Sequence, residues 1–244
     1  MTVETFKRPS MRRWSSRCGT LLAIAYLILG PCQQVLAQDV MKGSGPGRRG
    51  GNCRPVSDRD NEHNQDAGCW IIARVPQGEM SQGTVFWHVY RYPSRPEAEA
   101  VKGRRGTVIE GLGGTWLFAI GEAGWQPSPG AVRVAEIGPL HVKPGETYTA
   151  QYMVAVFTPG MTTPVHRHPG PEAWYTLSGE VCLETPNGKL VGRAGESTIV
   201  PAGPPMKLTA TGTEKRRSLV LILHETSQPS GIPVSDWTPK GLCK

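Results

Sequence analysis

Short apolar runs interrupted by Gly and Pro fill the region from residue 137 to residue 224, and this pattern restricts the fold more than any other feature. The runs are rich in β-branched and aromatic residues, which favour strands. They cover residues 148–157, 172–177, 180–185, 189–191, 197–200 and 218–224. Asn187-Gly188, between two of these runs, is a strong signal for a tight hairpin. Many short strands with such punctuation predict a β-sandwich or a closed β-barrel.

One segment of this region, residues 160–179, concentrates side chains that bind metals. His166 and His168 are two residues apart, so on a strand both imidazoles lie on one face. Glu172 follows a Pro-Gly-Pro turn at the start of the next run, where an antiparallel neighbour brings it opposite the two histidines. Two neutral imidazoles and one carboxylate form a facial triad for a first-row metal with open positions. The alternative is that the three side chains only line a polar groove.

The whole segment resembles the first motif of the cupin superfamily, in which a Gly, a His-x-His pair, a Glu and a second Gly follow at fixed spacings. These positions are occupied by Gly160, His166, His168, Glu172 and Gly179. The first half of the second cupin motif is matched at residues 195–203. The resemblance spans about residues 140–226. It implies a jelly-roll β-barrel over residues 136–226 that binds one divalent metal (Fe, Mn, Ni, Cu or Zn) through His166, His168 and Glu172.

The second motif departs from the family pattern at the position of its histidine ligand, where this chain has Met206. Met206 is either a soft thioether ligand, an apolar residue packed beside a three-ligand site, or a residue that leaves room for water. We favour apolar packing. His141 and His224 are weaker candidates for the missing ligand.

Two further side chains are candidates for the wall of a pocket. Trp174 and Thr176 share the inward parity of Glu172 on their predicted strand. For Trp174, packing in the barrel core is an equally good interpretation.

Residues 67–135 predict a small α+β unit ahead of the barrel. Strands are expected at 70–75 and 84–92, a helix capped by Ser94 and ending at Gly103, and a hairpin over 107–120. The unit shows no chemical motif, and we interpret His63 and His88 as surface or packing residues.

The N-terminus predicts an export signal over residues 1–37. Basic residues from Arg12 to Arg17 precede an apolar stretch over 21–29 that is too short to span a bilayer. Cleavage after Ala37 is expected, and the protein would then be periplasmic or secreted. An uncleaved anchor, a lipidated Cys32 and a twin-arginine signal are less favoured alternatives. Residues 38–66 contain few large apolar residues and predict a flexible leader.

Four cysteines remain after such cleavage, which is an even number in an oxidising compartment. They are Cys53, Cys69, Cys182 and Cys243. Three pairings are open, of which Cys53 with Cys69 is the local one, and Cys182 could instead be a reduced core residue. Cys243 is the penultimate residue of a polar tail formed by residues 227–244.

Charge gives no reason to expect a nucleic-acid partner. The formal net charge is +7, but the basic signal segment carries more than half of it. We expect a small-molecule ligand, no membrane contact after signal cleavage and, as one option, a homodimer. The functional hypothesis is an exported metal-binding cupin that works as a metal-dependent dioxygenase on a small organic substrate. The alternative is a binding module for a metal or small ligand without turnover.

Overall fold

The computed structural model describes residues 53–55, 67–127 and 130–244. The predicted signal peptide, most of the predicted leader and His63 lie outside these residues. The described residues belong to one compact unit. Within them, no helix has both the length and the apolar character needed to cross a membrane.

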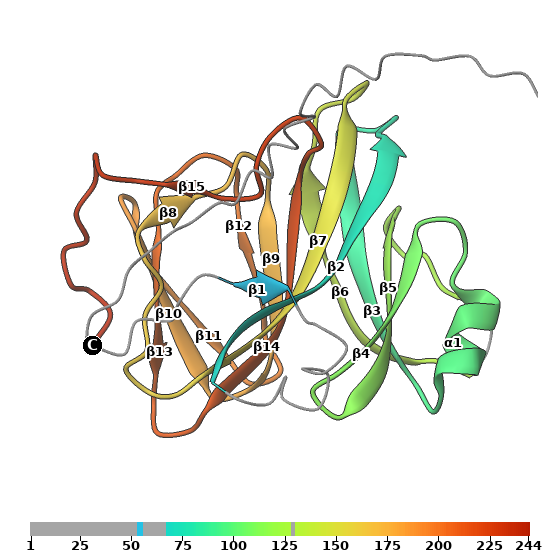
Figure 1. The fold of residues 1–244 in the computed structure, drawn as a ribbon, viewed down its shortest axis with the longest axis horizontal. Coiled ribbons are helices and arrows are strands. Elements are labelled where there is room, and N and C mark those ends of the chain that lie inside the picture. Colours follow the sequence, from blue (N-terminus) through green and yellow to red (C-terminus); the bar gives the residue numbers. More distant parts are fainter. Residues whose placement is uncertain (1–52, 56–66, 128–129) are drawn as a thin grey trace, which may run out of the picture. The chain divides into compact units, whose positions relative to one another are not determined.

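The largest sheet has six strands in the order β1-β2-β7-β14-β9-β12 (Figure 1). All neighbours are antiparallel except β1 and β2. The strands are β1 (Arg54–Pro55), β2 (Gly68–Glu79), β7 (Thr147–Phe157), β14 (Arg216–Glu225), β9 (Glu172–Ser178) and β12 (Ser197–Val200). Two smaller sheets complete the barrel region. They are formed by β11 (Gly188–Arg193), β10 (Glu180–Thr185) and β13 (Lys207–Thr211), and by β15 (Ile232–Pro233) and β8 (His166–Arg167). The predicted mainly β architecture is confirmed.

Alternation along the strands separates two apolar cores. On β14, Val220 and Ile222 contribute to one core, and Leu219 and Leu221 contribute to the other. The first core lies inside the barrel and includes Met206 together with residues of β7, β9, β10 and β13. The second core joins the opposite face of the large sheet to a separate four-stranded sheet, which is built mainly from residues 84–141. Both faces of β14 are therefore buried.

The four-stranded sheet has the order β4-β5-β3-β6, and α1 (Arg95–Val101), the one helix of the described residues, contacts three of these strands. Its strands are β4 (Gly106–Gly111), β5 (Gly114–Gly121), β3 (Thr84–Tyr92) and β6 (Val132–His141). Ser94 flanks the helix as predicted, but its hydroxyl donates to the Glu97 carboxylate at 2.7 Å and makes no bond to a backbone N–H. The helix ends two residues earlier than Gly103.

Two strands do not belong to the units in which they were predicted. β2 was expected in the α+β unit, but it pairs with β7 along its length in the large sheet. β6 pairs with β3, and it continues past residue 135 to His141. The two sheets share one core, in which the ring of Phe118 lies 5.1 Å from that of Tyr152.

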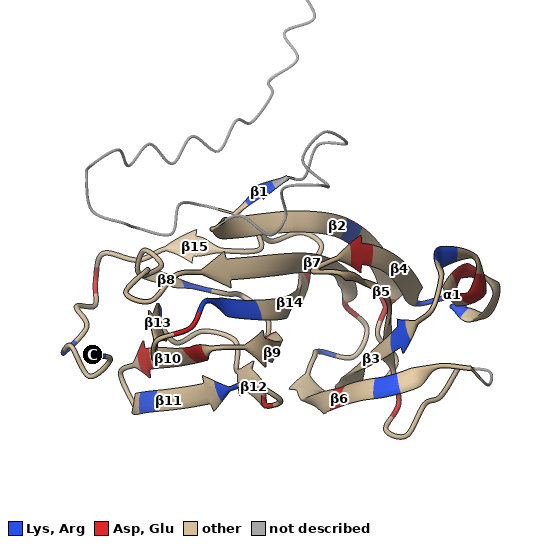
Figure 2. Ribbon diagram, turned by 90° about the horizontal axis from the view of Figure 1, so that it is seen from below, with Lys and Arg blue, Asp and Glu red and all other residues tan. Residues whose placement is uncertain are grey.

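Charged residues of both signs are scattered among the described strands, and most of the strand ribbon is uncharged (Figure 2). Val132 is the most exposed large apolar side chain among the described residues, and it lies at the start of β6.

Candidate metal centre

The two halves of the predicted site are held together by backbone hydrogen bonds. The N–H of His166 donates to the carbonyl of Met206 at 3.1 Å, and the N–H of Met206 donates to the carbonyl of His166 at 2.8 Å. The N–H of Gly203 donates to the carbonyl of His168 at 2.9 Å. The chain around Met206 is therefore the direct neighbour of the two histidines.

A tight turn returns the chain from the histidines to Glu172. Its Gly170 packs so closely on β14 that a Cβ there would lie 1.9 Å from the carbonyl oxygen of Leu223. Only Gly fits at this position. The neighbouring Pro171 accepts a hydrogen bond from the N–H of Leu223 at 3.0 Å. This turn places Glu172 at the start of β9, with its Oε2 3.4 Å from Nε2 of His168.

Both imidazoles are oriented by backbone carbonyls. Nδ1 of His166 lies 2.8 Å from the carbonyl oxygen of Pro164, and Nδ1 of His168 bonds the carbonyl oxygen of Ser230. Because a carbonyl only accepts, each Nδ1 carries the proton and each neutral ring keeps its lone pair on Nε2. The rings lie 4.8 Å apart and almost perpendicular. Nε2 of His168 is buried and has no hydrogen-bond partner in the described residues.

The local environment favours the metal-binding forms of His166 and Glu172, whereas for His168 it favours the protonated form. Burial, and then repulsion from His168, lower the pKa of His166 below its ordinary value. Burial opposes the charged form of His168, but the Glu172 carboxylate outweighs it and raises the pKa of His168. Burial likewise opposes ionisation of Glu172, but the two histidines and Arg216 outweigh it and lower the pKa of Glu172. At neutral pH Glu172 is therefore a carboxylate and His166 a neutral imidazole.

The geometry is only partly that of a metal site. His168 contacts both Glu172 and His166, but in the described residues no three His, Cys, Asp or Glu side chains form a cluster with metal-binding geometry. The donor set nevertheless fits a divalent first-row metal, because the unpartnered Nε2 of His168 faces a buried carboxylate. Backbone-fixed imidazoles of this tautomer are the usual ligands of such metals.

Met206 is almost completely buried, at 1% exposure, within the apolar core of the barrel. This burial agrees with the interpretation that Met206 is an apolar packing residue. Whether its thioether binds a metal is a question for experiment. His141 is exposed on β6, opposite Thr84. The ring of His224 bonds the carbonyl of Glu225 at 2.9 Å. No hydrogen bond or ion pair of the described residues joins either histidine to Glu172.

Trp174 and Thr176 are both buried on β9, on the side of the strand that also carries Glu172. Trp174 belongs to the barrel core, and its ring centroid lies 5.5 Å from the guanidinium carbon of Arg216. Arg216 is itself buried on β14. Sequence reasoning missed it, because neither Arg216 nor Arg217 stands out in the polar segment that contains both.

The C-terminal tail, predicted as a polar extension, docks on the short strand that begins at His166. β15 pairs with β8, and the N–H of Val234 donates to the carbonyl of Val165 at 3.2 Å. Arg167 donates to both carboxylate oxygens of Asp236 at 2.9 and 3.1 Å. Through Ser230 the tail therefore supplies a backbone partner of His168, which sequence reasoning did not find.

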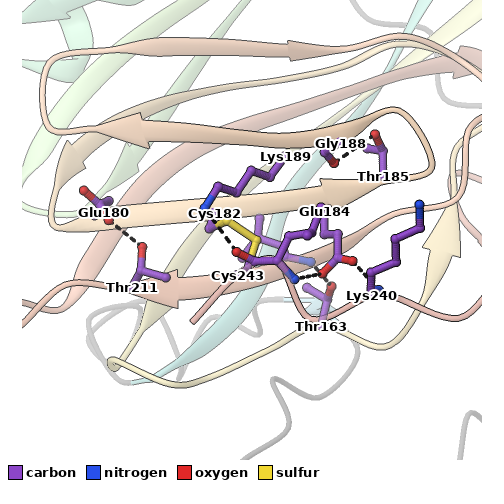
Figure 3. The surroundings of a disulfide bond; sticks show 12 residues. Thr163, Glu180, Cys182, Glu184, Thr185, Gly188, Lys189, Thr211, Lys240 and Cys243 are labelled. Carbon is purple, nitrogen blue, oxygen red and sulfur yellow. Dashed lines mark hydrogen bonds between the residues drawn. A yellow bond between two sulfur atoms is a disulfide. The ribbon is translucent and has the colours of Figure 1, made fainter.

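A disulfide fastens the end of the tail to the barrel (Figure 3). Cys182 of β10 pairs with Cys243, which excludes a reduced core cysteine at position 182. The buried carboxylate of Glu184 accepts from the N–H groups of Lys240 and Leu242. The second disulfide joins Cys53 to Cys69, the local pairing.

Comparisons with known proteins place the barrel in a family. The model of the cupin domain family matches residues 153–222. A comparison with curated proteins gave no match. Among solved structures, a DMSP lyase is 22% identical with a TM-score of 0.31, over 35% of this chain and 44% of the lyase chain. An oxalate oxidase is 23% identical with a TM-score of 0.30, over 36% of this chain and 46% of the oxidase chain.

A cupin superfamily protein from Desulfitobacterium hafniense is 16% identical with a TM-score of 0.29, over 35% of this chain and 74% of that protein. The chain thus spans less than half the length of the lyase and the oxidase. The family match covers the strands from β7 to β14 that carry His166, His168, Glu172 and Met206. Residues 153–222 therefore form a cupin-type domain.

Proposed function

We propose that the cupin barrel binds one divalent first-row metal through Nε2 of His166, Nε2 of His168 and the carboxylate of Glu172. The observation that carries this proposal is the buried Nε2 of His168, which has no hydrogen-bond partner in the described residues and lies 3.4 Å from Oε2 of Glu172. An unpaired buried acceptor is costly, and a metal would satisfy it. The backbone partners of both Nδ1 atoms support the same assignment, because they fix the tautomer that a metal needs.

We further propose that the metal-bound protein is a dioxygenase that acts on a small organic substrate. A bound first-row metal would supply a redox-active Lewis acid with open positions. Glu172, which is ionised at neutral pH, would accept a proton from the substrate. Trp174 and Thr176, buried on the same side of β9, would form the pocket wall.

Oxygen uptake by the metal-loaded protein tests this activity against a panel of small phenols and thiols. We expect uptake that depends on substrate and disappears in Glu172→Gln. The absence of uptake with every substrate would contradict the dioxygenase proposal.

A second candidate is a binding module without turnover. It is favoured by the absence, in the described part of the chain, of a closed cluster of three ligands, and by apolar packing of Met206 where the family has a histidine. Metal retained through purification, with no turnover of any substrate, would support this candidate.

We also propose that the protein works in the periplasm or outside the cell. The two disulfides support this, because such bonds persist in oxidising compartments. Intact mass of the protein from its native compartment tests the proposal. A mass that begins at Gln38 is expected, and one that includes residues 1–37 would contradict signal cleavage.

A further inference from the structure

Besides Nε2 of His168 and Nε1 of Trp174, three further buried side chains inside the cupin barrel carry polar atoms that have no hydrogen-bond partner in the described part of the chain. They are Thr176 on β9 and Arg216 and Ser218 on β14, with unpartnered atoms Oγ1, Nε and Nη2, and Oγ, respectively, among the described residues. Each side chain is at most 1% exposed. Buried polar atoms of native proteins nearly always have partners, so a cluster of exceptions points to a ligand.

The pairing of β9 with β14 brings the three side chains to one face. Ser218 lies directly opposite Thr176. The register of β9 with β14 shifts between Arg217 and Ser218, but the register of β14 with β7 is continuous there. Arg216 and Ser218 lie opposite Phe157 and Ala155, which both belong to the barrel core, so Arg216 shares the face of Ser218. The Arg216 guanidinium carbon lies 5.5 Å from the ring of Trp174 and 5.7 Å from the ring of Phe157, both of which are in the barrel core.

The same face leads to the candidate metal centre. Trp174, beside the guanidinium, is two residues from Glu172, which corresponds to about 7 Å along the strand.

Charge balance calls for an anion at this place. Burial lowers the pKa of Arg216 to about 10, so the guanidinium stays charged at neutral pH. Glu172 is the acidic group whose field acts on it, yet no ion pair joins the two among the described residues. A buried cation without a paired anion is strongly unfavourable. If Glu172 also binds a metal, its charge is shared and the deficit of negative charge grows.

We propose that Arg216, with Thr176 and Ser218, binds the carboxylate of a small organic acid inside the cupin barrel. The planar guanidinium matches a carboxylate through two parallel hydrogen bonds, and the two hydroxyls add donors. As an assignment of substrate class this inference rests on the proposed function, whereas as a binding site it stands without the metal.

The competing interpretation gives Arg216 a packing role only, as a cation between two aromatic rings. The two interpretations predict different behaviour of Arg216→Met, which conserves much of the volume and removes the charge. A packing role predicts a less stable protein and unchanged binding of acids. A binding role predicts a ligand-free protein at least as stable as the wild type, because an unpaired buried charge is removed.

The test is calorimetric titration of the full chain, with and without metal, with acetate, malonate and succinate, and with malonamide as the uncharged control. We expect at least one acid to bind while malonamide does not. Arg216→Met should weaken that binding about tenfold to a hundredfold, and Thr176→Val, which keeps the side-chain shape, by several fold. The acid should raise the melting temperature of the wild type and leave that of Arg216→Met unchanged.

Failure of all three acids to bind the wild type would overturn the inference, as would equal binding by Arg216→Met. Thr176→Val keeps the test valid if Arg216→Met does not fold, because unchanged affinity in this variant would also overturn it. The metal content of each sample separates this inference from the proposed function. Acid binding by a protein that takes up no metal would sink the metal centre and leave the carboxylate site standing.

Discussion

The docked tail makes the C-terminal residues part of the proposed metal centre, so removing them should weaken metal binding. The perturbation is a chain that ends at Thr226 and carries Cys182→Ala, which avoids a free thiol. Ser230 is lost with the tail, and with it the carbonyl that holds Nδ1 of His168. Loss of such a partner typically costs tenfold to a hundredfold in metal affinity, or about 1.4 to 2.8 kcal/mol.

Two effects of the truncation have to be separated, because the tail also closes a disulfide loop. Cys182 and Cys243 are 61 residues apart, and chain entropy assigns such a loop about 4 kcal/mol of the free energy of unfolding. The matched control is Cys182→Ala with Cys243→Ala in the full chain. It loses the disulfide but keeps Ser230, the pairing of β15 with β8 and the bond from Arg167 to Asp236. We expect the control to lose stability but to keep nearly all of its metal affinity.

Competition of each protein with a coloured chelator for zinc at neutral pH gives the affinities, and near-ultraviolet circular dichroism reports whether the core is folded. We expect the wild type and the control to bind zinc with similar affinity, and the truncated chain to bind it at least tenfold more weakly. A folded truncated chain with wild-type affinity would refute the role of Ser230. A control as weak as the truncated chain would show that the disulfide, and not the carbonyl, positions His168.

Three other predictions concern the site and the stability of the fold. Met206→Leu should keep the affinity and selectivity for metals, because Met206 packs as an apolar residue of similar volume; a selective loss of copper binding on titration would show that the thioether ligates. Replacing Cys53 and Cys69 together by Ala should lower the free energy of unfolding in urea by about 3 kcal/mol, which is the entropic contribution that the chain-entropy model assigns to a loop closed by residues 16 apart. A change below about 1 kcal/mol would contradict the entropic argument. Burial disfavours the charged form of His168, but Glu172 outweighs burial and raises the pKa of His168, so protons compete with the metal for Nε2 as the pH drops from above 6.5. Metal affinity should therefore decrease as the pH is lowered from about 8 to about 5.5. An affinity that does not change over this range would argue against an imidazole ligand.

The barrel strands and the spacing of the site were largely predictable, because each depends on local patterns. β3, β10 and β12 have the predicted bounds, and the predicted runs mark most of β7, β9 and β14. The turn through Gly170 also belongs to a local motif. Its physical cause, close packing against Leu223, appears only in the structure.

Features that depend on contacts distant in the sequence escaped prediction. β8 and β15 have two residues each, which is too short for a periodic pattern, and their paired residues Arg167 and Ile232 lie far apart in the sequence. The partner of His168 is the backbone carbonyl of Ser230, and a carbonyl leaves no mark in a sequence. Arg216 and Arg217 are adjacent and chemically alike, and only the register of β14 decides which one is buried.

Metal content measured on purified protein tests the central claim most directly. Wild type, His168→Ala and the control His141→Ala are prepared side by side, and elemental analysis gives the metal bound per chain. His141 is exposed on β6 and belongs to the other sheet, so its loss should have no effect. The proposed site predicts about one metal per chain in the wild type and the control, and far less in His168→Ala. Equal metal in all three proteins would contradict a centre built on His168.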